Sequence, residues 1–294
     1  MRRCLWLAVA GAFFLLAAAA AGGSRSGGRI VFVTNHLCGL RAVECGRAEI
    51  ATVRSSGGGA AILTRDSVSE ATPAWSPNGA QIAFFRPHRL GSAGQVWLMG
   101  STGARQRQLT HLKGIQYFGD LDWAPTGRSL VIDAFPSTAG GWTDLWLVSA
   151  ITGSTSRLTS TPLSEASPSW SPNGSWIAFF SQGRRLPYRI WRLSVATKRL
   201  VQLTSGTPAA AYPSWSPDSR RIAYTLGGRL ALMDADGSHK RVLRLFGTRP
   251  HWSPDGQWLV YVANGDLFKV RANGTGRTQL THHGKQVVND QPDW

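Results

Sequence analysis

The segment Pro73-Ala74-Trp75-Ser76-Pro77-Asn78-Gly79 is the most informative part of the chain, because versions of it recur along the sequence. The further copies occupy residues 123–127, 168–174, 213–218, 250–256 and, as a stub, 292–294. The distance from one tryptophan to the next runs from 37 residues, between Trp215 and Trp252, to 48 residues, between Trp75 and Trp123. A repeat of this period is typical of the four-stranded blades of a β-propeller.

Each repeat predicts a meander of four strands. After the tryptophan, Ser-Pro-Asn/Asp-Gly forms a turn, because proline presets φ at its first corner and glycine permits the positive φ at its exit. The apolar run that follows, such as residues 82–85, predicts a buried strand. A third strand, such as residues 95–99, closes on a hairpin signal. The fourth strand ends mostly in Leu-Thr, as at Leu109-Thr110.

The two ends of the chain predict a closed ring of six blades. Residues 29–33 match the second strand of a repeat whose first strand is missing, and residues 290–294 match a first strand with nothing after it. Joining these segments completes a sixth blade and removes sheet edges that would otherwise pair with other chains. The expected fold class is all-β: a six-bladed β-propeller of four-stranded antiparallel blades, the last closed by the C-terminal strand with the N-terminal strands.

The pattern Pro-x-Trp-Ser-Pro-Asp-Gly-x-x-Ile-Ala-Phe, followed by Leu-Thr, resembles the repeat of the TolB propeller. The same repeat occurs in the propellers of prolyl oligopeptidase-type and tricorn proteases. TolB carries a separate α/β domain ahead of its propeller, whereas only a few residues separate the leader from the first strand here. The TolB family engages a peptidoglycan-associated lipoprotein through one face of the channel, so the resemblance implies an envelope partner.

The first residues predict a secretory signal peptide. Arg2 and Arg3 precede an apolar run over residues 5–21 that ends in alanines. This order of charged, apolar and small residues predicts a signal peptide over residues 1–21, cleaved near Ala21, and a propeller domain over residues 22–294. An uncleaved anchor is the alternative, because the run is close to the lower length limit for crossing a bilayer. We expect an exported bacterial protein, periplasmic or extracellular, with no transmembrane span in the mature chain.

Two cysteines follow the leader. Cys38 and Cys45 lie in the long hairpin between Val33 and Glu49. In an oxidising compartment the simplest outcome is a disulfide between them. A metal pair or free thiols are the alternatives, although the sequence offers no second cysteine pair and only His36 nearby.

The chain is strongly basic. Its formal net charge is +16, and the mature chain keeps +14 because the leader holds two arginines and no acid. Such a field attracts anionic surfaces, including envelope polymers. The basic residues are scattered and mostly arginine, without a nucleic-acid motif, which favours a solvated basic surface. We expect no binding to nucleic acid.

Motifs of catalysis are absent from the sequence. It contains no Gly-x-Ser-x-Gly elbow, no His-Glu-x-x-His, no phosphate-binding loop and no dinucleotide fingerprint. His282 and His283 are adjacent, and neighbours on an extended chain point to opposite sides, which makes a poor chelate. The sequence therefore predicts no catalytic residue, no cofactor and no bound metal.

Polar residues cluster in the segments that lead into the first strands of the repeats. These strands line the central channel of a propeller, and the segments before them converge on one rim. The predicted ligand-binding rim consists of Glu70, Asp120, Asp122, Glu165, Tyr212, Arg249, His251 and Asp290. A ring of carboxylates can hold a cation or receive a peptide that carries lysine or arginine. The alternative is that these acids cap turns, accept backbone N–H bonds or pair with arginines.

These observations favour an exported, non-catalytic propeller that works as a protein-interaction module at the bacterial cell envelope. Its expected partner is an envelope protein or peptide, or an anionic envelope polymer, and the protein itself is expected to be a monomer. A second hypothesis is a metal-assisted lyase or hydrolase that acts on an anionic polysaccharide. A third is an accessory propeller that recruits substrate to a partner enzyme.

Overall fold

The structure is a computed structural model that describes residues 28–36, 48–65, 68–87, 94–112, 115–136, 142–183, 187–282 and 287–294. Across these ranges the chain forms strands and no helix, so no described segment is a helix suited to crossing a membrane. The predicted signal peptide, residues 1–21, and the predicted disulfide between Cys38 and Cys45 lie outside the described residues.

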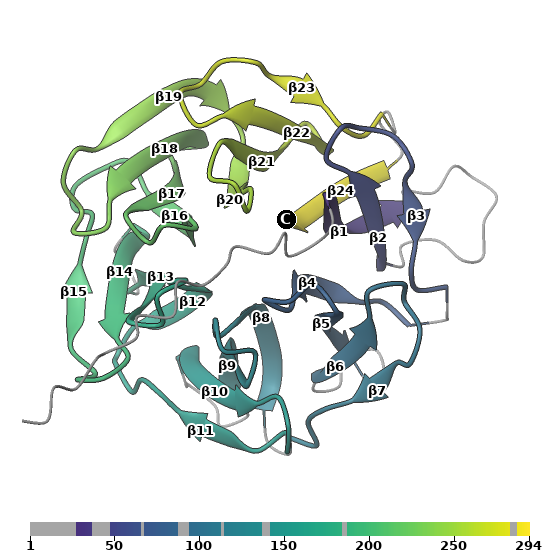
Figure 1. The fold of residues 1–294 in the computed structure, drawn as a ribbon. Coiled ribbons are helices and arrows are strands. Elements are labelled where there is room, and N and C mark those ends of the chain that lie inside the picture. The colour runs from purple at the N-terminus through teal and green to yellow at the C-terminus, as the bar shows by residue number, and fades with distance from the viewer. Residues whose placement is uncertain are drawn as a thin grey trace, which may run out of the picture.

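Six antiparallel sheets of four strands each surround a central axis (Figure 1). The innermost strands are β4 (Ala71–Trp75), β8 (Ile115–Trp123), β12 (Ser164–Trp170), β16 (Ala210–Trp215), β20 (Thr248–Trp252) and β24 (Val287–Asp293). The second strands are β1 (Arg29–His36), β5 (Gln81–Pro87), β9 (Ser129–Pro136), β13 (Trp176–Gln182), β17 (Arg221–Leu226) and β21 (Trp258–Ala263). The third strands are β2 (Ala48–Arg54), β6 (Gly94–Gly100), β10 (Asp144–Ser149), β14 (Arg189–Ser194), β18 (Arg229–Asp234) and β22 (Asp266–Arg271). The outermost strands are β3 (Ala61–Ile62), β7 (Arg107–Gln108), β11 (Thr155–Arg157), β15 (Leu200–Gln202), β19 (Arg241–Phe246) and β23 (Thr278–Gln279).

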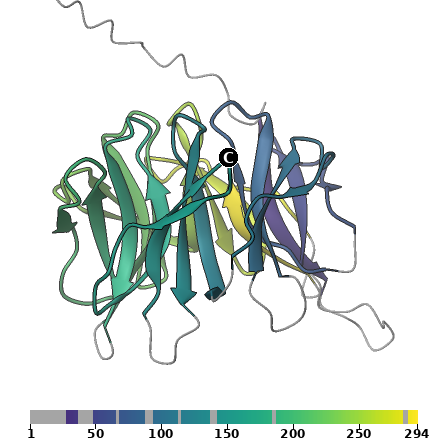
Figure 2. The same ribbon diagram turned by 90° about the horizontal axis from the view of Figure 1, so that it is seen from below.

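We number the blades by their strands. Blade 1 contains β24, β1, β2 and β3, and blades 2 to 6 contain β4–β7, β8–β11, β12–β15, β16–β19 and β20–β23. The strands run between the two faces of the ring (Figure 2). All inner strands begin at the same face, which we call the entry face. Because the strands are antiparallel, each second strand ends there and each third strand begins there.

The repeated turn has the hydrogen bonds that its sequence requires. In blade 2, Ser76 Oγ accepts the backbone N–H of Gln81 at 2.9 Å and donates to Asn78 Oδ1 at 2.8 Å. Gly79 has φ of 67°, a left-handed conformation that glycine adopts without strain. This local chemistry reverses the chain between the inner and second strands, as predicted.

The two ends of the described chain close the ring. Strand β24 pairs antiparallel with β1, with Asp293 opposite Val31 and Asp290 opposite Val33. The Trp294 side chain is buried in a core cluster with Ile30 and Phe32. The predicted six-bladed, all-β fold with a composite blade is therefore confirmed.

Basic side chains fasten neighbouring blades to one another. Arg192 of blade 4 donates to the carbonyl oxygen of Ala235 in blade 5 at 2.8 Å, and Arg241 of blade 5 donates to that of Ala272 in blade 6 at 2.8 Å. Lys269 of blade 6 donates to the carbonyl of Ser55 in blade 1 at 2.7 Å. Part of the positive charge therefore stabilises the ring itself.

Candidate functional site

A backbone irregularity repeats in every inner strand. The pairing of each inner strand with its second strand is interrupted by a register shift, as between Ala71 and Ala74 of β4. In five blades the residue at the shift has a left-handed φ between 48° and 55°: Thr72, Ser167, Tyr212, Arg249 and Gln291. Such bulges redirect side chains and are common beside functional sites. Here they turn side chains of all six inner strands toward the axis.

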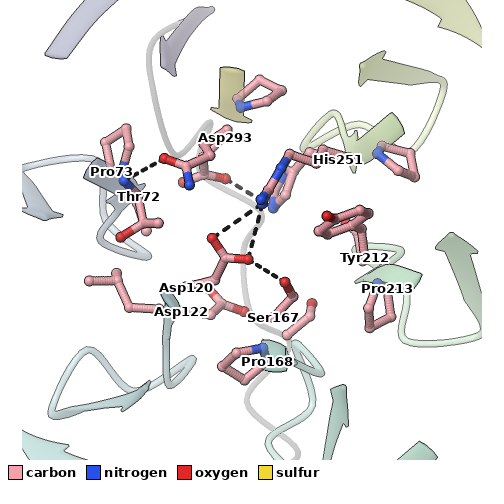
Figure 3. A pocket seen from close by; sticks show the side chains of 18 residues that line it. Thr72, Pro73, Asp120, Asp122, Ser167, Pro168, Tyr212, Pro213, His251 and Asp293 are labelled. Carbon is pink, nitrogen blue, oxygen red and sulfur yellow. Dashed lines mark hydrogen bonds and ion pairs between the residues drawn. The ribbon is translucent and has the colours of Figure 1, made fainter. Parts of the chain in front are cut away.

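Two rings of side chains line the resulting axial cavity (Figure 3). The first ring contains Thr72, Asp120, Ser167, Tyr212, Arg249 and Gln291. The second ring, two residues further along each strand, contains Ala74, Asp122, Ser169, Ser214, His251 and Asp293. The cavity has a volume of about 90 Å³. We call it the axial cavity.

Arg249 crosses the axis and ties three blades together. Its Nη1 lies 3.0 Å from Asp120 Oδ2, in the blade opposite its own in the six-membered ring, and its Nε lies 3.2 Å from Asp290 Oδ1. The guanidinium also lies over the ring of Tyr212, 4.3 Å from its centroid. Burial lowers the pKa of Arg249, but the charges of Asp120 and Asp290 outweigh it, so the pKa rises above its usual value. Arg249 is therefore a fixed positive charge inside an acidic channel.

An aromatic cluster connects the axial cavity to the entry face. The Tyr212 ring packs edge-on against Phe180, with centroids 5.4 Å apart, and Phe180 packs against Tyr188 at 4.9 Å. Tyr188 precedes β14 and is 38% exposed. A partner that reaches the cavity from this face would contact this apolar surface.

The sequence did not single out Asp133, which lies directly behind Asp120. Asp133 is buried on β9, and its carboxylate accepts the backbone N–H of Asp120. Gly119 is necessary here, because a Cβ at that position would collide with the Asp133 carboxylate. Burial raises the pKa of Asp133 well above its usual value, and the neighbouring charge of Asp120 raises it further.

Replacing Asp133 with asparagine is expected to stabilise the protein increasingly as the pH rises. Above roughly pH 3.9 the unfolded carboxyl is ionised, whereas the folded one keeps its proton up to its raised pKa. The wild-type free energy of unfolding therefore falls with pH in this window, by at most about 1.4 kcal/mol per pH unit, and Asp133→Asn removes that loss. Urea denaturation of both proteins between pH 4 and pH 8 measures the difference.

Asp236→Asn is a control in which the pH dependence of the free energy of unfolding is expected to change in the opposite direction. Asp236 is exposed, and hydrogen bonds from Ser238 lower its pKa. Its carboxylate therefore contributes stability above the unfolded pKa, which is lost as the pH falls. If the difference in free energy of unfolding between Asp133→Asn and wild type does not change with pH, Asp133 is ionised in the folded protein and its pKa is not raised.

The acids of the second ring bind backbone N–H groups of the next blade. Asp122 Oδ2 accepts the N–H of Trp170 at 2.6 Å, and Asp293 Oδ2 accepts that of Trp75 at 2.5 Å. His251 Nε2 lies 3.0 Å from the other oxygen of Asp293. These contacts join neighbouring blades and leave the carboxylates on the wall of the cavity.

Three polar atoms of the cavity wall have no hydrogen-bond partner among the described residues. They are Thr72 Oγ1, Ser214 Oγ and His251 Nδ1. Thr72 and Ser214 are only 5% and 2% exposed. A buried polar atom without a partner costs about 1–3 kcal/mol, so such atoms in a cavity indicate a place for a ligand.

Glu70 and Glu165 lie away from the axial cavity, although the sequence placed them on the rim. Thr64 Oγ1 accepts the N–H of Ile50 at 2.9 Å and donates to Glu70 at 2.9 Å, and Glu70 also pairs with Arg86 at 2.8 Å. In blade 4, Glu165 accepts bonds from Thr159 and Thr161, and burial raises its pKa. Their contacts match the alternative role, in which the acids hold turns and pair with arginine.

We use the name threonine clamp for a threonine hydroxyl that accepts a backbone N–H of the third strand and donates to a nearby side chain, as Thr64 does. This clamp explains why threonine recurs in the Leu-Thr pairs. Gln95 of β6 accepts from Thr110 at 2.9 Å, and Asp266 of β22 accepts from Thr281 at 2.8 Å. These two acceptors belong to third strands, whereas Glu70 and Glu165 follow their threonines by six residues. The pairs were predicted to end the fourth strands, but β7 ends at Gln108, one residue before Leu109. Beyond β7, the backbone N–H groups of Leu109 and Thr110 still donate to the Val96 carbonyl oxygen, at 2.8 Å and 3.3 Å. The Thr110 hydroxyl accepts the N–H of Val96 at 2.9 Å.

The other predicted rim residues gather at the axis. Asp120, Asp122, Tyr212, Arg249 and His251 line the cavity, and Asp290 contacts Arg249. Gln291 and the hydroxyl residues of the rings were outside the predicted set. In the described part of the chain no three His, Cys, Asp or Glu side chains are arranged to hold a metal ion.

These features define the class of protein: a six-bladed β-propeller whose candidate binding site is an acidic cavity on its axis. The chain belongs to the family of the TolB beta propeller domain, whose profile matches residues 42–247. A second profile, the N-terminal region of dipeptidyl peptidase IV, matches residues 246–294.

Sequence relatives include TolB proteins and a peptidase. The Tol-Pal system protein TolB of Anaeromyxobacter dehalogenans (strain 2CP-C) is 29% identical over 133 residues, which is 45% of this chain and 29% of the relative. The uncharacterized peptidase YuxL of Bacillus subtilis (strain 168) is 26% identical over 157 residues, or 42% of this chain and 23% of the relative. The chain thus spans less than a third of either relative.

Solved structures share the fold. TolB from Acinetobacter baumannii has a TM-score of 0.73 at 22% identity, covering 91% of this chain and 66% of that one. An oligogalacturonate lyase in complex with manganese has a TM-score of 0.55 at 16% identity, covering 87% and 74%. At these identities the likeness concerns the fold alone.

Proposed function

We propose that the protein is an exported, non-catalytic binding module of the bacterial cell envelope, which receives a segment of a partner protein at the entry face of its channel. The observation that carries the proposal is the axial cavity, whose wall is acidic and where two buried hydroxyls, those of Thr72 and Ser214, have no partner among the described residues. The match to the TolB propeller and the apolar leader over residues 1–21 support an envelope location.

The charge of the cavity favours a cationic side chain from the partner. The cavity wall carries the carboxylates of Asp120, Asp122 and Asp293, and Asp290 adds a fourth beside Arg249. Arg249 supplies the one guanidinium among the lining residues. This local excess of negative charge occurs in a chain whose net charge is +16. A lysine or arginine side chain would therefore be attracted to the axis and repelled by much of the remaining surface.

The size of the cavity limits what enters it. One water molecule needs roughly 10–15 Å³ of such space, so 90 Å³ holds about six to nine waters or one long side chain. An intact polysaccharide chain or a folded domain does not fit. The partner therefore inserts a side chain, and the rest of the segment lies across the entry face near Tyr188.

The test is capture of an envelope protein by the immobilised mature chain, with identification by mass spectrometry. Asp290→Lys reverses a charge beside Arg249 and is expected to reduce the retained protein at least tenfold. Asp236→Lys is the matched control, because Asp236 lies in the turn after a third strand, at the opposite face, and is exposed. Equal retention by the two variants would exclude the channel as the binding site.

A second candidate is an accessory propeller that presents substrate to a hydrolase. The match of residues 246–294 to the dipeptidyl peptidase IV region and the similarity to a peptidase favour it. The same capture experiment separates the two candidates, because this one predicts that the retained protein is a hydrolase.

A further inference from the structure

Blade 5 has an unusually long outer edge. Its outermost strand, β19, spans six residues, whereas the outermost strands of the other blades span two or three. β19 pairs with β18 on one side only and lies on the outer rim of the ring (Figure 1). An edge strand presents a row of unpaired backbone N–H and C=O groups, to which another extended chain can bind.

Along β19, Leu243 is buried and Leu245 is half-buried, whereas the other four side chains are exposed. The pairing of β19 with β18 shifts register between Val242 and Phe246. Leu243 faces the core, whereas Val242 and Phe246 are 45% and 68% exposed. Arg244 lies between them and is also exposed, so the outward face reads apolar, basic, apolar. Only two other large apolar side chains in the described part of the chain are comparably exposed, Ile151 and Tyr188.

The surroundings of β19 are basic. Arg229 lies over the Phe246 ring, 4.5 Å from its centroid, and Lys240 and Arg241 stand at the start of the strand. None of these cations, nor Arg244, forms an ion pair with another described residue. Arg241 also borders a groove of about 460 Å³ between blades 5 and 6, together with Arg221 and Arg271. Asp234 is the one carboxylate among its lining residues.

We propose that β19 is a second docking site, which adds an extended acidic segment of a partner protein as a fifth strand of blade 5. On the face toward Val242, Arg244 and Phe246, which is formed by every second residue of the partner strand, apolar residues would cover Val242 and Phe246 and acidic residues would pair with Arg244 and Arg229. Charge complementarity selects this occupant. A second copy of the chain would place like charges opposite one another, which is destabilising.

This site is separate from the axial cavity in both position and charge. It lies on the outermost strand of a blade, whereas the cavity is lined by the innermost strands. The cavity is acidic and suits a cationic side chain, and β19 is basic and suits an acidic strand. Either site can fail its test without affecting the other.

The test uses a short fluorescent peptide with the repeat Val-Ser-Glu-Ser, which places valine and glutamate in turn on one face of a strand. A peptide of equal length with glutamine in place of glutamate is its counterpart. Fluorescence anisotropy is expected to show binding of the glutamate peptide only, weakening as salt is added. Hydrogen exchange is expected to slow at the backbone amides of β19. Arg244→Glu and Phe246→Ser are each expected to weaken binding at least tenfold.

Matched variants separate docking from loss of fold. Ile151→Ser removes an exposed apolar side chain from a turn of blade 3 and is expected to leave binding unchanged. Arg244→Gln removes the charge but keeps a polar side chain, and it is expected to bind the glutamate peptide with intermediate affinity. Each variant is first shown to unfold at the wild-type midpoint. Three results would overturn the proposal: equal binding of both peptides, binding of neither, or protection from hydrogen exchange confined to other strands.

In these cases the arginines serve only to prevent other chains from pairing with the edge strand. Sedimentation showing a dimer that Arg244→Glu abolishes would also overturn it.

Discussion

A chain that ends at residue 282 is expected to lose cooperative folding, because it lacks β24. That strand is the inner strand of blade 1, and its removal leaves β1 as a free edge along the axis. It also removes Trp294 from the core and Asp293 from the backbone N–H of Trp75 in blade 2. The loss of one buried tryptophan costs about 3–5 kcal/mol, and the missing strand adds to this. The total approaches the whole stability of a typical domain, about 5–15 kcal/mol.

Thermal unfolding followed by circular dichroism measures this effect. If a transition remains, its midpoint is expected to lie at least about 10 °C below that of the full chain. A synthetic peptide of residues 287–294, added in excess, is expected to restore part of the loss, whereas a scrambled peptide of the same composition is not. An unchanged midpoint for the shortened chain would show that blade 1 does not depend on β24.

Glu70→Ala is expected to destabilise the protein by about 3–5 kcal/mol, the cost of breaking a buried ion pair from one side. Glu70 is 1% exposed, and the Arg86 side chain that it pairs with is 11% exposed. The change also removes the acceptor of the Thr64 hydroxyl. Urea denaturation measures the loss, and Asp236→Ala, at an exposed turn, is expected to cost less than about 0.5 kcal/mol.

A double variant separates the charge from the packing. Glu70→Gln with Arg86→Met removes both charges while keeping similar volumes, and is expected to recover most of the stability lost by Glu70→Ala. Partner capture by folded Glu70 variants is expected to match that of wild type, because Glu70 does not line the cavity. A Glu70→Gln variant that keeps full stability but no longer captures the partner would show that Glu70 belongs to the binding rim.

The fold could be predicted from the sequence because its signals are local and repeated. Each Trp-Ser-Pro-Asn/Asp-Gly unit forms its own turn through contacts a few residues apart, such as that from Ser76 to Gln81. Repetition then fixed the number of blades, and the incomplete repeats at the ends indicated the closure that β24 and β1 form. Leu-Thr was recognised as a marker, but the clamp from threonine to Glu70 or Glu165 was not.

The candidate site could be predicted only in part. Counting residues before each tryptophan identified Asp120, Arg249 and His251, because the inner strands share one geometry. The bulge before the second ring was not visible in the pattern, so Gln291 and the unpartnered Thr72 and Ser214 were missed. Asp133 could have been noticed as an acidic residue within an otherwise apolar strand. Nothing in the sequence, however, places it behind Asp120.

The order of residues along the chain specifies which segments form strands, how many blades they build and where the ring closes, since turns and alternating burial depend on neighbouring residues. Which acids face the axis depends on the assembled ring. Asp120 and Arg249 are 129 positions apart and meet only because their blades stand opposite each other in the closed ring. Glu70 directly precedes inner strand β4 and Asp290 lies within inner strand β24, yet the first is buried and pairs with Arg86, and the second pairs with Arg249. The role of each acid therefore depends on the partners that the closed ring brings near it, and not on its residue type.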